Sequence, residues 1–285
     1  MENSIDISVK KIIEEELSSE ITYINDNNEN FKRGNSWTYC YNTFNEYSKK
    51  DFLNEKDYEF LALNLSFYLA SWGMYRGSSF LLYMDYKIHT DAIKMMMNKK
   101  YAPLFDKNIH QNKNVYIKLL FAQDEDKGIY VLLNDYYTKI HNNLLEKTGN
   151  GSEQETSDTL ITKILLGVYG CIPAFDRFFK DAFGLFGGQK LLSTNGNAIT
   201  KERNGLLSIL ETDIGKEIQN WGSNDIPYMK KVDMYFYSLG FTMSKKAYEN
   251  ATKTKNKKPT QKEYDTALKE IKTDVQAKIK EKYIK

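Results

Sequence analysis

The stretch that most constrains how this chain can fold is its least polar run, residues 159–186, TLITKILLGVYGCIPAFDRFFKDAFGLF. Because 27% of the whole chain is charged, an apolar run of this length is expected to lie inside the protein. It contains one of only four prolines, Pro173, and predicts two helices broken near residues 170–173. Asp176 follows among aromatic side chains, where an ionised carboxylate needs a partner or a chemical task.

Apolar residues recur at helical spacing along most of the chain, and runs of β-type alternation are lacking. All four prolines are expected between helices, and Asp91 is expected to cap one of them. Outside the central run, helices are expected at residues 5–17, 36–52 (or an irregular segment), 56–69, 91–98, 114–122, 128–145, 203–221, 227–240 and from 259 onward. The prediction is an all-α fold of roughly ten helices, in one large domain or two closely packed helical lobes.

The segment KTGNGSEQETS is the clearest linker of the chain. It divides the sequence into an expected N-terminal helical lobe (residues 1–146), a linker (147–158) and a helical core (159–243). A basic C-terminal helix is expected at residues 244–285. From residue 241 onward the chain carries 13 lysines and 6 acidic residues, a net charge of +7. Such an end suits nucleic acid or an acidic partner, although a solvated lysine-rich helix explains it equally well.

Two cysteines and three scattered histidines show no metal-ligand spacing, so we expect neither a disulfide framework nor a metal site, and no cofactor. No run reaches the roughly 18 apolar residues of a membrane span, and the N-terminus is amphipathic and acidic. The expectation is a cytoplasmic protein that does not contact a membrane.

Residues 72–79, WGMYRGSS, combine an arginine with glycines and serines. Accessible backbone N–H groups and hydroxyls of Ser78 and Ser79 beside Arg76 would suit a phosphate, and Trp72 and Tyr75 could stack on a base. The alternative is a tight helix crossing in which Arg76 forms an internal ion pair. Asp233, in an aromatic helix, could likewise pair with a cation or act as an acid or base.

One part of the chain consists of Thr162-Lys163, then an apolar helix, then Cys-Ile-Pro-Ala-Phe-Asp-Arg, which ends at Arg177. This part resembles the core of helix-hairpin-helix DNA glycosylases. The stretch from Lys231 to Phe236, followed by Leu-Gly, is similar to a closing helix of some divergent members. The resemblance covers about 80 residues, and it implies an enzyme that flips a damaged or modified base out of double-stranded DNA and excises it. Some divergent members act in phage defence against modified bases.

The resemblance implies that Asp176 is the catalytic carboxylate of a monofunctional enzyme. Cleavage of the N-glycosidic bond builds positive charge on the sugar, which a fixed carboxylate stabilises. Base-pocket candidates and DNA-backbone candidates follow from residue type and place. They are Trp72, Tyr75, Tyr169, Asp233 and Tyr237 for the pocket, and Arg76, Ser78, Ser79, Lys163 and Arg177 for phosphates.

A second hypothesis is a non-catalytic helical module that binds nucleic acid or protein. Asp176 would then cap the helix that follows Pro173, and losing it would cost stability without affecting a reaction. A nuclease toxin is the third hypothesis. The sequence argues against it, because the chain has no clustered carboxylates with lysine at endonuclease spacing and no paired Arg and His as in helical ribonucleases.

Overall fold

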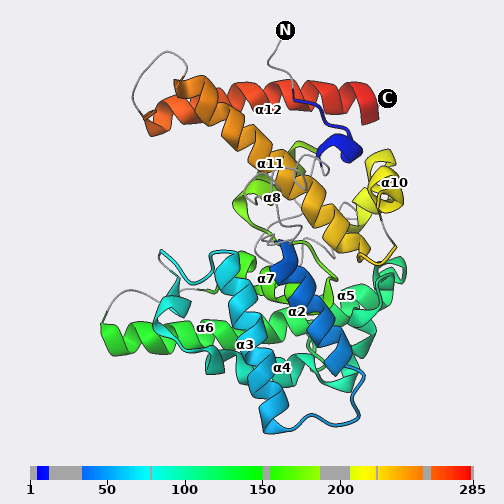
Figure 1. Ribbon diagram of the computed structural model, residues 1–285, viewed down its shortest axis with the longest axis vertical. Helices are drawn as coiled ribbons and strands as arrows, with labels where there is room; N and C mark the ends of the chain where they lie inside the picture. Colours follow the sequence, from blue (N-terminus) through cyan, green and yellow to red (C-terminus); the bar gives the residue numbers. More distant parts are fainter. Residues whose placement is uncertain are drawn as a thin grey trace, which may run out of the picture. The chain divides into compact units, whose positions relative to one another are not determined.

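The computed structural model describes residues 5–12, 34–77, 79–149, 155–186, 206–222, 224–252 and 258–283 (Figure 1). These residues form α-helices and short 3-10 helices, with no β-strand among them. The all-α prediction is therefore confirmed. None of the described helices combines the length and the apolar character needed to cross a membrane.

The chain folds into two compact units, each named after its central helix. The α7 unit comprises residues 23–174 and 227–230, and the α11 unit comprises residues 1–22, 175–226 and 231–285. The border at residue 174 lies inside the segment 159–243 that was expected to form one core. The physical reason is that the two halves of the apolar run pack on different partners. Helix α7 (Asp158–Tyr169) packs on α2 (Gly34–Tyr47), α3 (Glu55–Ser71) and α6 (Ile129–Thr148). Helix α8 (Arg177–Phe183) instead packs on η6 (Gly184–Phe186) and α11 (Tyr228–Thr252).

The α7 unit is built around α7 (Asp158–Tyr169), whose residues from 160 to 169 are all buried. A helix that is apolar on every side must be surrounded by other helices. Three of these are α2 (Gly34–Tyr47), α3 (Glu55–Ser71) and α6 (Ile129–Thr148). The remaining elements are η2 (Phe80–Tyr83), η3 (Tyr86–His89), α4 (Thr90–Met96), η4 (Lys99–Phe105), η5 (Ile109–Gln111) and α5 (Lys113–Phe121).

Two glycines allow the close packing of α7. A Cβ on Gly167 would lie 2.5 Å from the ring of Tyr68, so α3 approaches α7 only because this side chain is missing. Gly170 ends the helix with φ +64°, and its N–H donates to the carbonyl of Leu166. Glycine adopts this left-handed conformation without a steric penalty. The break expected at residues 170–173 is thus confirmed.

The α11 unit contains the longest helix of the chain's described part, α11 (Tyr228–Thr252), from Lys231 onward. Phe179 and Phe183 of α8 (Arg177–Phe183) pack edge-on against Phe236. The unit also contains η6 (Gly184–Phe186), η8 (Leu206–Glu211), α10 (Asp213–Asn220) and α12 (Gln261–Tyr283). The expected apolar stripe of the last helix is confirmed, because Ile271, Val275 and Ile279 are buried.

Four local predictions need correction or qualification. Thr90 begins α4 and His89 occupies its N-cap position, so Asp91 lies in the first turn and is not the cap. The single helix expected at 203–221 is divided, because the Thr212 side chain caps a new helix by accepting the N–H of Gly215. Pro103 lies inside η4 and not between helices. Of the helix expected at 5–17, residues 9–12 are helical, residues 5–8 are not, and residues 13–17 lie outside the described residues.

Candidate functional site

Asp176 begins α8. Its backbone is extended (φ −80°, ψ 176°), and its Oδ1 accepts the N–H of Phe179 at 3.0 Å. The preceding segment, residues 171–175, is buried, whereas Asp176 itself is half-buried. The carboxylate is therefore held at the start of a helix, where the helix dipole favours a negative charge.

Aromatic side chains lie directly after this carboxylate. The guanidinium of Arg177 lies 4.8 Å from the ring centre of Phe178. That ring contacts Tyr237 and Phe241 of α11 edge-on, with centroids 5.6 and 5.4 Å away. Arg177 is exposed and Tyr237 is half-buried, so the structure brings these two sequence-predicted residues to one surface of the α11 unit.

Asp233 also belongs to the α11 unit and is buried within α11. Its neighbour Lys231 is buried too, and its Nζ donates to the carbonyl of Gln219 at 3.1 Å. Burial disfavours the charged ammonium and lowers the pKa of Lys231. The sequence did not single out Lys231, since adjacent lysines on a helix are ordinarily solvated.

In the α7 unit the structure brings Trp72 and Lys163 together. The Lys163 Nζ donates to the Trp72 carbonyl at 3.2 Å and lies 5.6 Å from the ring centre. Lys230 lies 5.5 Å from the same ring and 5.1 Å from that of Trp37. The two lysines are only 6% and 7% exposed, so this tryptophan–lysine cluster is a packed interior feature. Lys163 therefore does not present its ammonium to solvent as a phosphate contact requires.

Arg76 is exposed, and its side chain folds back over Gly73. A Cβ on Gly73 would lie 2.6 Å from Arg76 Nε, and Gly73 has φ +75°. The glycine thus has both a conformational and a steric reason to be there. Ser79 caps η2 by accepting the N–H of Leu81 at 3.4 Å. Ser78 lies outside the described residues.

The half-buried Tyr75 directs its hydroxyl into the protein. Its hydroxyl lies 2.8 Å from His89 Nε2 and donates to Ser66 Oγ at 3.3 Å, while His89 Nδ1 lies 2.6 Å from the Tyr137 hydroxyl. Because Tyr75 donates to Ser66, it accepts the Nε2 proton, and Tyr137 donates to Nδ1. His89 is fully buried, and burial lowers its pKa to about 3. This histidine–tyrosine chain was not foreseen from the sequence.

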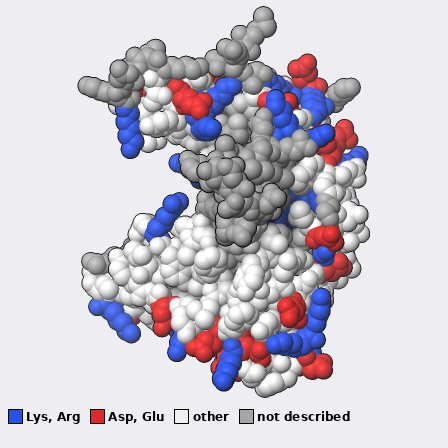
Figure 2. All heavy atoms as spheres, in the orientation of Figure 1, with Lys and Arg blue, Asp and Glu red and all other residues white. Residues whose placement is uncertain are grey.

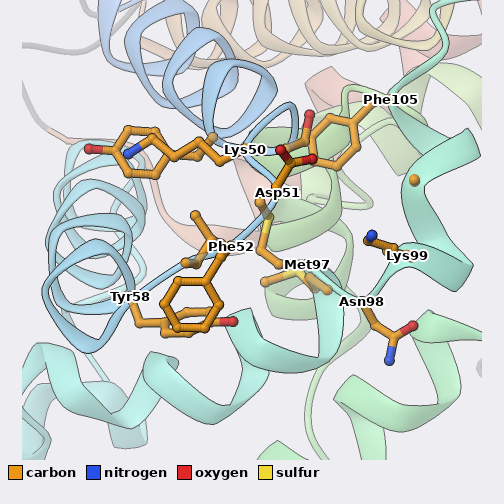
Figure 3. A pocket seen from close by; sticks show the side chains of 13 residues that line it. Lys50, Asp51, Phe52, Tyr58, Met97, Asn98, Lys99 and Phe105 are labelled. Carbon is orange, nitrogen blue, oxygen red and sulfur yellow. The ribbon is translucent and has the colours of Figure 1, made fainter.

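Tyr169, expected in the base pocket, is a core residue. It is fully buried, its ring packs edge-on against Phe105, and its hydroxyl donates to the Met96 carbonyl. Phe105 and Met96 line a pocket of about 190 Å³ in the α7 unit, together with Phe52, Tyr58 and Met97 (Figure 3). Ligand sites commonly measure about 300–1,000 Å³, so this pocket fits one ring or side chain. None of the sequence-predicted site residues lines it.

Uncharged side chains cover much of the face formed by α2 and α3 in the α7 unit (Figure 2). Three apolar side chains of α3, Phe60, Leu63 and Phe67, are exposed at helical spacing. Their exposure alone does not indicate what kind of partner would bind them.

The described residues contain no group of three or more His, Cys, Asp or Glu that could hold a metal ion. No protein-family model matches the chain, and neither a curated protein nor a solved structure matches it significantly.

Proposed function

We propose that this protein is a DNA glycosylase that hydrolyses the N-glycosidic bond of a modified or damaged base flipped out of DNA. The observation that carries the proposal is the placement of Asp176. Its carboxylate is half-buried, is held by the N–H of Phe179, and stands at the start of a helix behind a buried Pro-containing segment. The resemblance to helix-hairpin-helix glycosylases puts the catalytic carboxylate at this point of the chain.

The proposed chemistry uses one carboxylate and one water molecule. As the bond from C1′ to the base breaks, its electron pair leaves with the base and the sugar becomes an oxocarbenium ion. Asp176 stabilises this cation, and a water oxygen then bonds to C1′ while its proton passes to the carboxylate. The base takes up a proton from the solvent as it leaves, and the carboxylate then returns its own proton to the solvent. A carboxylate already fixed by a backbone N–H needs no reorganisation during the reaction.

The second hypothesis is a helical nucleic-acid- or protein-binding module in which Asp176 only caps α8. The hydrogen bond from the Phe179 N–H to Asp176 favours this second hypothesis, because helix capping by itself explains why an acid stands before α8. The two functions make different predictions for the same substitutions. They are therefore tested together.

The test is an abasic-site assay on a panel of DNAs, including phage genomes with hypermodified bases, read out by alkaline cleavage. Asn is as good an N-cap as Asp, so Asp176→Asn is expected to keep the melting temperature nearly unchanged. The proposal predicts abasic sites with the wild-type protein and none with Asp176→Asn. Phage DNA is included because excision of its modified bases would indicate a role in phage defence.

Thr212→Ala is the matched control. It removes the N-cap of α10 in the same unit, which costs about 0.5–2 kcal/mol, as does Asp176→Ala. The proposal predicts product from Thr212→Ala and none from Asp176→Ala at equal loss of stability. Absence of product from the wild type on every DNA, or equal product from Asp176→Asn, would refute the glycosylase and leave the capping role.

A further inference from the structure

A row of aromatic side chains follows one side of α11 in the α11 unit. Tyr237, Phe241 and Tyr248 fall within an arc of about 40° at 100° per residue, and they span about 16 Å of helix. The rings of Tyr237 and Phe241 are nearly parallel, at an interplanar angle of 7° with centroids 6.2 Å apart. Aromatic side chains on a helix ordinarily turn inward, so a row that stays accessible needs a reason.

Two members of this row, Phe241 and Tyr248, are accessible to solvent. Phe241 is 47% exposed and Tyr248 is 44% exposed, and Phe178 of α8 supports Phe241 from the side. The support is firm because Gly240 lets the two helices touch: a Cβ there would lie 2.0 Å from the Phe178 carbonyl oxygen. The row is thus fixed on a close helix crossing.

Positive charge accompanies the row. Arg177 lies on the Phe178 ring, and Lys245 is exposed one turn beyond Phe241. The only acid on α8, Asp181, has its charge balanced by Lys272 at 2.7 Å. The chain from residue 241 to its end carries a net charge of +7. Exposed rings interspersed with cations match a ligand that offers both flat faces and phosphates.

We infer that this row, with Phe178, Arg177 and Lys245, binds unpaired nucleic acid by stacking bases on its rings. Base stacking on aromatic side chains combined with cationic backbone contacts is how proteins hold single strands. At about 3.4 Å per nucleotide, 16 Å accommodates about four or five stacked bases. Paired bases hide their faces within the duplex, so this surface favours single strands over duplexes. A protein helix would gain from the rings but not from the cations.

The experiment measures fluorescence anisotropy of a labelled twelve-nucleotide oligo-dT and of a twelve-base-pair duplex. It uses Asp176→Asn protein, so that no excision can occur. Oligo-dT is expected to bind more tightly than the duplex. Phe241→Ala and Tyr248→Ala are each expected to weaken oligo-dT binding by about 5- to 100-fold. Phe241→Leu keeps the apolar contact with Phe178 but removes the stacking face, and it is expected to weaken binding similarly.

Phe52→Ala is the matched control, since it removes a 78% exposed phenylalanine from the α7 unit. Circular dichroism confirms that each variant is folded. Three results would each overturn the inference: no oligo-dT binding by the parent protein, unchanged binding by folded Phe241→Leu, or an equal loss in Phe52→Ala. The inference does not rest on the glycosylase. If oligo-dT binds through the aromatic row but the wild-type protein forms no abasic product, only the glycosylase proposal is refuted. If abasic product forms but the aromatic substitutions leave oligo-dT binding unchanged, only the proposed binding surface is refuted.

Discussion

The imidazole of His89 is fully buried between Tyr75 and Tyr137, and both of its nitrogens are hydrogen-bonded. The site holds a neutral ring, because Tyr75 accepts one proton and Tyr137 fills the other lone pair. A second proton would place a positive charge on a ring that is buried away from water. This explains why the pKa of His89 lies at about 3.

His89 therefore makes the stability of the protein depend on acid. In the unfolded chain histidine takes up its proton near pH 6.5, whereas folded His89 does so only near pH 3. Stability is thus fully present above about pH 6.5 and is lost as the pH falls toward 3, by at most about 1.4 kcal/mol per pH unit. His89→Gln is expected to be less stable at pH 7.5, yet to lose less stability between pH 6.5 and 4.5.

Urea denaturation at several pH values in that range measures this slope. The control is His141→Gln, since His141 is half-buried against Phe80 and burial lowers its pKa as well. It is expected to change the slope less than His89→Gln does. An unchanged slope in His89→Gln would show that other groups account for the acid sensitivity.

At the scale of elements, the helices cross where glycines remove a side chain. Gly167 brings α7 onto α3, and Gly240 brings α11 onto α8. In the sequence these glycines only weaken a helical pattern. Their role in packing depends on which helix lies opposite, and that partner is distant in the sequence.

Gly240→Ala reverses the usual sign of a helix substitution. In an open helix, Gly→Ala stabilises by about 1 kcal/mol. Here the new methyl group would lie 2.0 Å from a backbone oxygen of α8, which cannot rotate away. The expected result is a loss of about 1–3 kcal/mol in the free energy of unfolding.

Thermal and urea unfolding measure the effect of Gly240→Ala. Gly149→Ala is the comparison, because a Cβ there meets nothing within 4 Å and only its φ of +66° opposes the substitution. We expect Gly240→Ala to cost more. A stabilised Gly240→Ala variant would mean that α8 and α11 do not cross as closely as described.

At the scale of the whole molecule, the charge is unevenly distributed: the last 45 residues carry +7 and the first 240 carry −5. Lys262, Lys269 and Lys280 of α12 are exposed, so they are available for phosphate contacts. Lys272 and Lys278 instead take part in the fold, through an ion pair with Asp181 and a hydrogen bond to the Ile5 carbonyl. Removing α12 would therefore disturb the unit, and substitution of its exposed lysines is the cleaner test.

The triple variant Lys262→Gln, Lys269→Gln and Lys280→Gln is expected to bind DNA more weakly. If all three lysines contact phosphates, the slope of log affinity against log salt decreases by about 3. Lys49→Gln, Lys56→Gln and Lys99→Gln, three exposed lysines of the α7 unit, make the same charge change elsewhere. An equal decrease in both triple variants would mean that α12 contributes only general charge.

The sequence by itself determined the all-α class, the positions of most helices and the break after Gly170. These follow from local periodicity, glycine and proline, which act within a few residues of the chain. It also singled out Asp176 at the start of α8, since capping is a local property. The division of the segment 203–221 escaped detection because a single Thr212 hydroxyl decides it.

Only the tertiary structure decided which of the polar and aromatic side chains are buried. Tyr75 and Tyr169 looked like ligand-stacking residues, yet they donate hydrogen bonds inside the α7 unit, to Ser66 and to the Met96 carbonyl. Lys163 was expected to contact phosphates, yet it lies against Trp72, as Lys230 also does. The division into two units likewise depends on which helices meet. A side chain's neighbours come from segments far along the chain, and burial is the sum of those contacts, which no local pattern records.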